Sequence, residues 1–161
     1  MNEERLLEGV ALLPPTPSLQ LITDASLEGW GAHLEPLGLT VSGTWSPLES
    51  RLHINNLEMR AVNLAISHFS RHVQTHCIML STDNTTVVSY IRKQGGTQSF
   101  SLYLETRALL LLCRELQITL HAKHIPGRLN VLADGLSRKN QILPSEWSLL
   151  QEVANQIFLI L

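Results

Sequence analysis

Ile78-Met79-Leu80-Ser81-Thr82-Asp83-Asn84 is the stretch of this sequence that decides the fold. Its first five residues predict a short and mostly apolar strand. The chain from Asn84 to Gln94 predicts a helix that Gly95-Gly96 ends. Asp83 stands at the junction of the two elements. A strand that passes directly into a helix indicates a sheet flanked by helices.

Three short segments before this unit also predict strands. They cover residues 19–26, 29–34 and 39–45. In the third, Leu39, Val41, Gly43 and Trp45 alternate with polar residues, which is the period of a half-buried strand. Three short strands in succession predict an antiparallel meander.

The remaining elements complete an α/β order. Helices are predicted for residues 55–72, 99–116, 130–138 and 146–158, and a fifth strand for residues 119–125. The order through residue 138 is therefore β-β-β-α-β-α-α-β-α, which implies a mixed sheet. The helix over residues 99–116 is apolar almost all round from Leu109 to Leu112, so it is predicted to be deeply buried or covered by a partner.

Length and composition predict one globular domain with an extension at each end. The chain has 161 residues, 44% of them hydrophobic and 16% charged, which argues against disorder. A proline-rich lead-in is expected over residues 1–18, the domain over residues 19–140, and a helical C-terminal extension over residues 141–161. The apolar runs are too short to span a membrane, the start of the chain is acidic, and the two cysteines fit a reducing compartment. We therefore expect an intracellular protein, cytoplasmic or nuclear.

The net charge of −2 conceals an uneven distribution of charged residues. Residues 51–140 hold eleven Lys or Arg against five Asp or Glu, whereas residues 1–50 hold seven carboxylates and one basic residue. The middle of the chain is thus able to present a basic face to nucleic acid, although charge alone favours ordinary solvated side chains.

Four acidic residues stand at or near the ends of predicted elements: Asp24, Glu58, Asp83 and Asp134. Each alone has an ordinary structural explanation, such as a helix cap for Asp83 or a dipole interaction for Glu58 at the start of its helix. Strand ends and helix starts of a mixed sheet nevertheless converge on one edge. Carboxylates gathered there repel one another unless cations neutralise them.

This convergence predicts a metal site. Carboxylate oxygens are the ligands of Mg²⁺ and Mn²⁺, which keep open positions for water and for substrate phosphate oxygens. Two such ions about 4 Å apart activate a water and stabilise a leaving oxygen, which is the chemistry that cuts a phosphodiester.

Five blocks of residues occur in a distinctive order along the chain. They are Thr23-Asp24-Ala25-Ser26, Gly29-Trp30-Gly31-Ala32, His53-Ile54-Asn55-Asn56-Leu57-Glu58, Ser81-Thr82-Asp83-Asn84, and His124-Ile125-Pro126-Gly127 with Asn130 and Ala133-Asp134-Gly135-Leu136-Ser137-Arg138. In this order they resemble the ribonuclease H domain of retroelement reverse transcriptases. The likeness is greatest to DIRS-like elements, with gypsy-like elements close behind, and Arg92-Lys93-Gln94-Gly95-Gly96 followed by Ser99 is similar to the DIRS-type sequence.

The resemblance implies a ribonuclease H-like fold, with a five-stranded mixed sheet and helices on both faces. It also implies that two Mg²⁺ ions, for which Mn²⁺ can substitute, support hydrolysis of the RNA strand of an RNA–DNA hybrid. Asp24 would bridge both ions, Glu58 would hold one of them near the strand being cut, Asp83 would bind the ion that positions the attacking water, and Asp134 would complete the second site.

Two features depart from the cellular members of the family. The span from Pro126 to Asn130 is short and lacks the histidine that assists the cellular enzymes, and the segment from Gln94 to Ser99 is neutral where some of them carry a basic protrusion. In the family a polymerase domain normally precedes this one. The resemblance therefore implies a reverse transcriptase polymerase domain in the parent polyprotein, which would supply much of the grip on substrate.

Small polar and basic residues near the predicted site are candidates for substrate contacts. Recognition of a hybrid depends on 2′-hydroxyls and backbone rather than on base sequence. A capping or turn role is as good an explanation for the uncharged candidates. The candidates are Asn55, Asn56, Asn84, Gln94, Ser99, Arg128 and Arg138, and Arg51, Arg92, Lys93 and Lys139 are also candidates for phosphate contacts, although the sequence does not place them on one face.

Two other functional classes remain open. The chain is alternatively a catalytically weak or silent module that binds nucleic acid or a protein partner, through the leucine-rich helix or the apolar tail Ile157–Leu161. A different nuclease or a transposase of the same fold is the third possibility, but the block His53–Glu58 favours ribonuclease H. The sequence does not define the oligomeric state.

Overall fold

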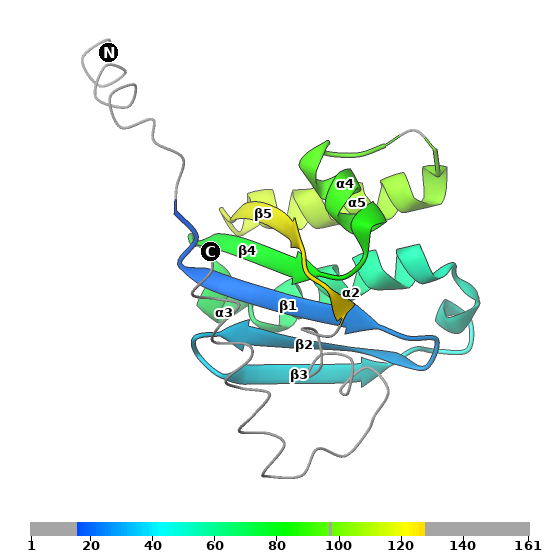
Figure 1. The fold of residues 1–161 in the computed structure, drawn as a ribbon, viewed down its shortest axis with the longest axis horizontal. Helices are drawn as coiled ribbons and strands as arrows, with labels where there is room; N and C mark the ends of the chain where they lie inside the picture. Colours follow the sequence, from blue (N-terminus) through cyan, green and yellow to red (C-terminus); the bar gives the residue numbers. More distant parts are fainter. Residues whose placement is uncertain (1–15, 97, 128–161) are drawn as a thin grey trace.

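A five-stranded mixed sheet forms the centre of the protein. The computed structural model describes residues 16–96 and 98–127, and within this part the strands have the spatial order β3-β2-β1-β4-β5 (Figure 1). β1, β2 and β3 pair antiparallel as the predicted meander, whereas β4 pairs parallel with β1 and β5 pairs parallel with β4. The strands are β1 (Leu19–Ala25), β2 (Gly29–Glu35), β3 (Leu39–Thr44), β4 (Cys77–Thr82) and β5 (Thr119–His124).

The described helices follow the predicted order, with one correction. The helix predicted over residues 55–72 is divided at Phe69, whose backbone (φ −92°, ψ 17°) departs from helical geometry. The carbonyl of Phe69 accepts the N–H groups of His72 and Val73, and this starts a separate turn. The helices are the 3₁₀ turn η1 (Glu49–Arg51), α2 (Ile54–His68), α3 (Ser70–Val73), α4 (Thr85–Arg92) and α5 (Phe100–Glu115).

Several sequence-based predictions fall on other parts of the chain. The helices predicted for residues 130–138 and 146–158 lie outside the described residues, as does the lead-in up to residue 15. The helices that are described cover one face of the sheet in Figure 1. None of them combines the length and the apolar character that a membrane crossing requires.

The main core lies between the sheet and α2. Alternation along β2 turns Ala32 and Leu34 toward α2, where they are fully buried with Leu57 and Ala61. α5 covers this layer only in part: Leu109 is fully buried, but Leu111 is 53% exposed. The leucine-rich helix is predicted to be deeply buried or covered by a partner. The structure shows instead that one side of it is buried and the other side is open to solvent.

The sheet also depends on a close cross-strand contact at Gly43 of β3. Gly43 is paired with Trp30 of β2, and the indole of Trp30 lies against it. A Cβ atom at Gly43 would lie 2.5 Å from Nε1 of Trp30, so no larger residue fits without moving the buried ring.

We expect Gly43→Ala to lower the free energy of unfolding by about 1–3 kcal/mol, because the added methyl group displaces the indole. Denaturant titration followed by tryptophan fluorescence measures this change. Ser42→Ala, at the exposed neighbouring position, is the matched control and should stay within about 0.5 kcal/mol of the parent. Equal stabilities of the two variants would contradict the packing described.

Candidate active site

Two of the predicted carboxylates lie at the carboxyl ends of neighbouring strands. β1 and β4 pair in parallel, with Ile22 opposite Ser81. Asp24 follows Ile22 by two residues within β1, and Asp83 directly follows β4. Because the two strands run in the same direction, both side chains come to the same edge of the sheet.

Glu58 reaches this edge from α2. His53 caps the helix, since its Nδ1 accepts a hydrogen bond from the N–H of Asn55 at 3.1 Å. The helix begins at Ile54, so Glu58 falls just after the first turn, next to the buried Leu57. Only 5% of Glu58 is exposed. A carboxylate at this depth needs a compensating proton, donor or cation.

Asp24, Glu58 and Asp83 together form what we call the acidic cluster. Each residue offers one carboxylate oxygen, and these oxygens all lie within 4.8 Å of one another. Asp24 and Glu58 are buried, and Asp83 is half-buried. Three carboxylates at these distances cannot all be ionised without a strong repulsion.

The electrostatic effect of the cluster is concentrated on Glu58. Burial, followed by the charges of Asp24 and Asp83, raises the pKa of Glu58 from 4.5 to about 9, although a hydrogen bond from the backbone of Ala25 opposes the rise. Without a cation Glu58 is therefore protonated at neutral pH. Its Oε2 atom is buried and has no hydrogen-bond partner among the described residues.

The ligand set fits a hard divalent cation. The three carboxylates come from three elements and supply oxygen atoms alone, which are the ligands that Mg²⁺ and Mn²⁺ prefer. A buried oxygen without a donor, such as Oε2 of Glu58, is costly, and a cation would satisfy it. Asp24, Glu58 and Asp83 are thus able to hold such an ion.

The fourth predicted acid, Asp134, lies outside the described residues, as do Arg128 and Arg138. The last described residue is close to the cluster. A Cβ atom at Gly127 would lie 3.3 Å from Oδ2 of Asp83. The chain that continues toward Asp134 therefore starts beside the acidic cluster.

Asn84, not Asp83, caps α4. Oδ1 of Asn84 accepts a hydrogen bond from the N–H of Val87 at 2.9 Å, which is the usual N-cap contact. Its Nδ2 atom donates to Oδ1 of Asn55 at 2.9 Å. Asn84 thereby connects the start of α4 to the start of α2, and the capping explanation considered for Asp83 applies to its neighbour.

A polar groove lies next to these asparagines, between the starts of α2, α4 and α5. Asn56 donates to the hydroxyl of Ser101 at 3.3 Å, and Ser99 caps α5 and donates its N–H to the hydroxyl of Tyr90 at 3.1 Å. A cavity of about 370 Å³ is lined by His53, Asn55, Asn56, Thr86, Tyr90, Gln98, Ser99, Ser101 and Leu102.

Sequence analysis identified Asn55, Asn56 and Ser99 but missed the groove residues Thr86 and Tyr90. The sequence did offer a signal for Tyr90, since it is an aromatic residue with a hydroxyl group among the apolar residues of α4. The other candidate, Gln94, is exposed, has a positive φ of 55° and lines a larger adjoining cavity of about 760 Å³. The structure brings these polar groups to one side of α4.

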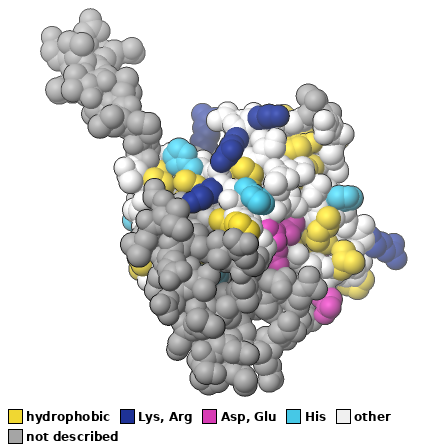
Figure 2. Space-filling view, in the orientation of Figure 1, with side chains coloured by type: hydrophobic (Ala, Val, Ile, Leu, Met, Phe, Trp, Pro, Cys, Tyr) yellow, Lys and Arg dark blue, Asp and Glu magenta, His cyan; other side chains and the backbone are white. Residues whose placement is uncertain are grey.

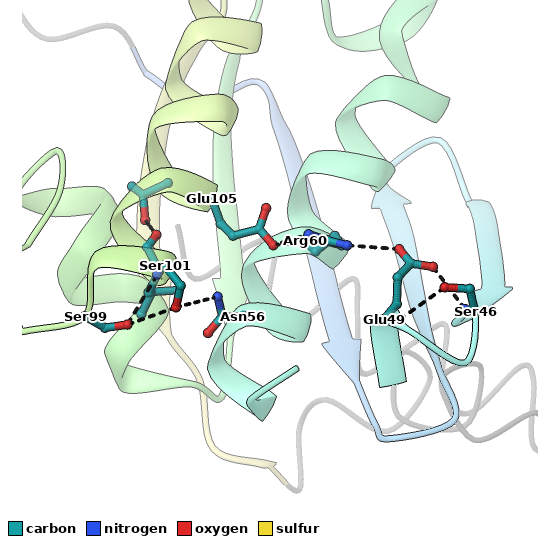
Figure 3. A network of polar contacts seen from close by, with 9 residues as sticks. Ser46, Glu49, Asn56, Arg60, Ser99, Ser101 and Glu105 are labelled. Atoms are coloured by element: carbon teal, nitrogen blue, oxygen red, sulfur yellow. Dashed lines mark hydrogen bonds and ion pairs between the residues drawn. The ribbon is translucent and has the colours of Figure 1, made fainter. Parts of the chain in front are cut away.

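Arg60 holds the elements around the groove in place (Figure 3). From α2 it donates through Nε to Oε2 of Glu105 on α5 at 2.8 Å, and through Nη1 to Oε2 of Glu49 in η1 at 3.2 Å. Glu49 in turn accepts from the N–H of Ser46 at 3.0 Å. These half-exposed pairs contribute little stability singly, but they fix the orientation of α2, which carries Glu58.

One curated protein shows sequence similarity to this chain. The enzymatic polyprotein of carnation etched ring virus is 28% identical over 136 residues, which cover 76% of this chain. The chain spans only 19% of the length of that polyprotein. No protein-family profile matches the chain.

Several solved structures superimpose on this chain over most of their length. Ribonuclease H1 from Halobacterium salinarum superimposes with a TM-score of 0.63 at 19% identity, covering 75% of this chain and 95% of the archaeal one. The N-terminal RNase H domain of a Mycobacterium tuberculosis protein has a TM-score of 0.58 at 16% identity, covering 76% and 97% of the two chains. LC11-RNase H1, solved in complex with an RNA/DNA hybrid, has a TM-score of 0.58 at 16% identity, covering 76% and 96%. The protein therefore has a ribonuclease H-like fold, as its motifs predict.

Proposed function

We propose that the protein is a metal-dependent endonuclease that hydrolyses the RNA strand of RNA–DNA hybrids. The observation that carries the proposal is the acidic cluster, in which oxygens of Asp24, Glu58 and Asp83 lie within 4.8 Å of one another at the edge of a ribonuclease H-like sheet. A fold alone does not define activity, so the chemistry of this site has the decisive weight.

The acidic residues would hold the catalytic ions. Asp24, Glu58 and Asp83 would bind them, with Asp134 completing the set, since the chain leaves Gly127 next to Asp83. Two Mg²⁺ ions, or Mn²⁺ in their place, would activate a water and stabilise the leaving oxygen. Glu58 would bind as the carboxylate, since a bound cation would offset both the burial and the neighbouring charges that raise its pKa.

The polar groove is suited to the backbone of a hybrid. Asn55, Asn56 and Ser99 line it, and neutral hydrogen-bonding groups are able to recognise 2′-hydroxyls and sugar edges without reading bases. We propose the same role for Asn84 and Gln94, and phosphate contacts for Arg128 and Arg138. LC11-RNase H1, which shares the fold, has been solved with an RNA/DNA hybrid, and this agrees with the proposed substrate.

The natural context of the domain is proposed to be a polyprotein. Its curated relative is a viral enzymatic polyprotein of which the chain matches about a fifth, 19%. We propose that a reverse transcriptase polymerase domain accompanies this one in the same polyprotein, and that the parent is a DIRS-like or related retroelement, on the evidence of the sequence blocks described above.

A silent interaction module is the second candidate, and the outer side of α5 favours it. Phe100, Leu104 and Leu111 are 74%, 45% and 53% exposed, an unusual number of large apolar side chains on one helix. A protein that used α5 for partner binding would not require the acidic cluster. Loss of the cluster carboxylates therefore separates the two candidates.

Asp83→Asn is expected to reduce cleavage of a labelled RNA–DNA hybrid by about a thousandfold or more, as is typical when one member of a catalytic unit is removed. The assay compares Mg²⁺, Mn²⁺ and EDTA, with double-stranded DNA as the competing substrate. Glu115→Gln removes an exposed carboxylate on α5 and is the matched control, which should cut normally. A folded parent protein that binds the hybrid and leaves its RNA intact in Mg²⁺ and Mn²⁺ would favour the silent module.

The raised pKa of Glu58 predicts an inverse dependence of stability on pH in the metal-free protein. Between about pH 5 and pH 9 the folded state retains a proton on Glu58 that the unfolded state has released. Unfolding therefore releases a proton, and stability falls as pH rises through this range. Below pH 4.5 Glu58 is protonated in both the folded and the unfolded state, so it no longer lowers the free energy of unfolding.

Glu58→Gln should accordingly stabilise the metal-free protein at about pH 8.5 by about 1–3 kcal/mol, because a neutral amide replaces a group that must ionise or hold a proton. Thermal melts in EDTA at several pH values measure this. Mg²⁺ should raise the melting temperature of the parent and have little effect on the variant. A variant that is less stable than the parent at high pH in EDTA would contradict the assignment of the shift to burial and repulsion.

A further inference from the structure

A second concave site lies beside α4 and shares no lining residue with the polar groove. It is a cavity of about 300 Å³ between α4 and the edge strand β5. We call it the basic cavity. The charged or titratable side chains that line it are all basic, and two hydroxyl groups accompany them. Its lining residues are Thr85, Val88, Ser89, Arg92, Lys93 and His124.

The basic cavity begins beside the acidic cluster. His124 ends β5 opposite Thr82, the last residue of β4, and Asp83 follows Thr82 directly. Thr85 is the first residue of α4 and lines the cavity. A strand held at the acidic cluster is thus able to continue into this cavity.

The cationic groups of the cavity are available to an anion. Nε of Arg92 donates to the carbonyl of Ala122 at 3.0 Å, which anchors the guanidinium at the sheet edge and leaves its other donors unused by that bond. Arg92, Lys93 and His124 are exposed, and within residues 16–96 and 98–127 none of them forms an ion pair with a carboxylate. Guanidinium, ammonium and hydroxyl donors around one hollow suit a phosphate group.

A different explanation exists for basic residues at this edge. Lysine on an edge strand discourages pairing with other chains, and Lys123 of β5 fits that role. Arg92 and Lys93, however, stand at the end of α4, not on the strand. In Figure 2 most of the visible Lys and Arg side chains lie in the upper part of the view, above the acidic side chains at its centre, and one lies apart at the right edge. Basic groups at the end of a helix also interact favourably with its dipole, but the position of Arg92 and Lys93 near the acidic cluster suits a polyanion that the cluster would hold.

We propose that the basic cavity binds the phosphodiester backbone of a single nucleic-acid strand that continues beyond the hybrid held at the acidic cluster. The volume of about 300 Å³ is at the lower end of the range for small-ligand sites, so the cavity suits a single phosphate and its sugar. The inference rests on the proposed function, because it names a further part of the same substrate. The protein would thus offer the polar groove to the hybrid and the basic cavity to a single strand, with α4 lining both.

The test compares the binding of hybrids that differ only in a single-stranded RNA overhang. Binding is measured by fluorescence anisotropy in the presence of EDTA, which prevents cutting. The probes are one blunt hybrid and the same hybrid with a 5′ or a 3′ RNA overhang. We expect one overhang to tighten binding by about tenfold at low salt. The double variant Arg92→Gln/Lys93→Gln should lose this gain. The slope of log K against log salt concentration should also become shallower by about 1.4, which is about 0.7 for each charge removed.

Arg71→Gln/Arg114→Gln is the matched control, since it removes the same charge from exposed positions on α3 and α5. It should keep the gain from the overhang. Arg92→Lys retains the charge and should keep most of it too, which separates phosphate binding from the anchoring bond to Ala122. Thermal melts of all variants verify that the fold is intact.

The outcomes distinguish this inference from the proposed function. If neither overhang improves binding, or if both double variants weaken it equally, the basic cavity is not a strand site, while cleavage of the blunt hybrid in Mg²⁺ still supports the nuclease. If the overhang gain depends on Arg92 and Lys93 but no hybrid is cut, the cavity inference stands and the nuclease proposal fails.

Discussion

The close approach of three carboxyl groups, two of them buried, is the constraint on which the rest of this structure depends. Nothing in the apolar core requires Asp24, Glu58 and Asp83 to lie within 4.8 Å of one another, and burial together with the neighbouring charges raises the pKa of Glu58 to about 9. Such a site is destabilising in itself, so other parts of the fold must hold it together. The parallel pairing of β1 with β4 and the well-packed face of α2 provide that support.

The surrounding polar contacts serve the same end by fixing α2 from several directions. Arg60 bridges it to α5 and η1, and Asn56 reaches Ser101 (Figure 3). Asn55 also accepts a bond from Asn84. Each bond is worth little alone, but together they restrict the rotation and sliding of the helix that carries Glu58. These contacts also form the polar groove, because its walls are the starts of α2, α4 and α5, which the contacts join.

Much of this architecture follows from local patterns in the sequence. The alternation in residues 39–45, the apolar segment before Asp83 and the Gly95-Gly96 stop predict the element order, and strand ends that share an edge predict the meeting of Asp24 with Asp83. The break at Phe69 was not predictable, because it depends on backbone angles that helical periodicity does not encode. Neither was the division of roles between Asp83 and Asn84, since both residues are good helix caps and only tertiary contacts select one. The basic cavity also escaped detection, because His124 and Arg92 are far apart in the chain and meet only through the packing of α4 on β5.

The pairing of β1 with β4 also orders the events of folding. It joins Ile22 to Ser81, about 60 residues along the chain, whereas β1, β2 and β3 are joined by short turns. Contacts between distant residues carry a greater loop-closure entropy and generally form later than hairpins. The nascent protein can thus assemble its meander and begin α2 while Asp24 and Asp83 are still apart. The charge repulsion is introduced only when enough of the core exists to withstand it.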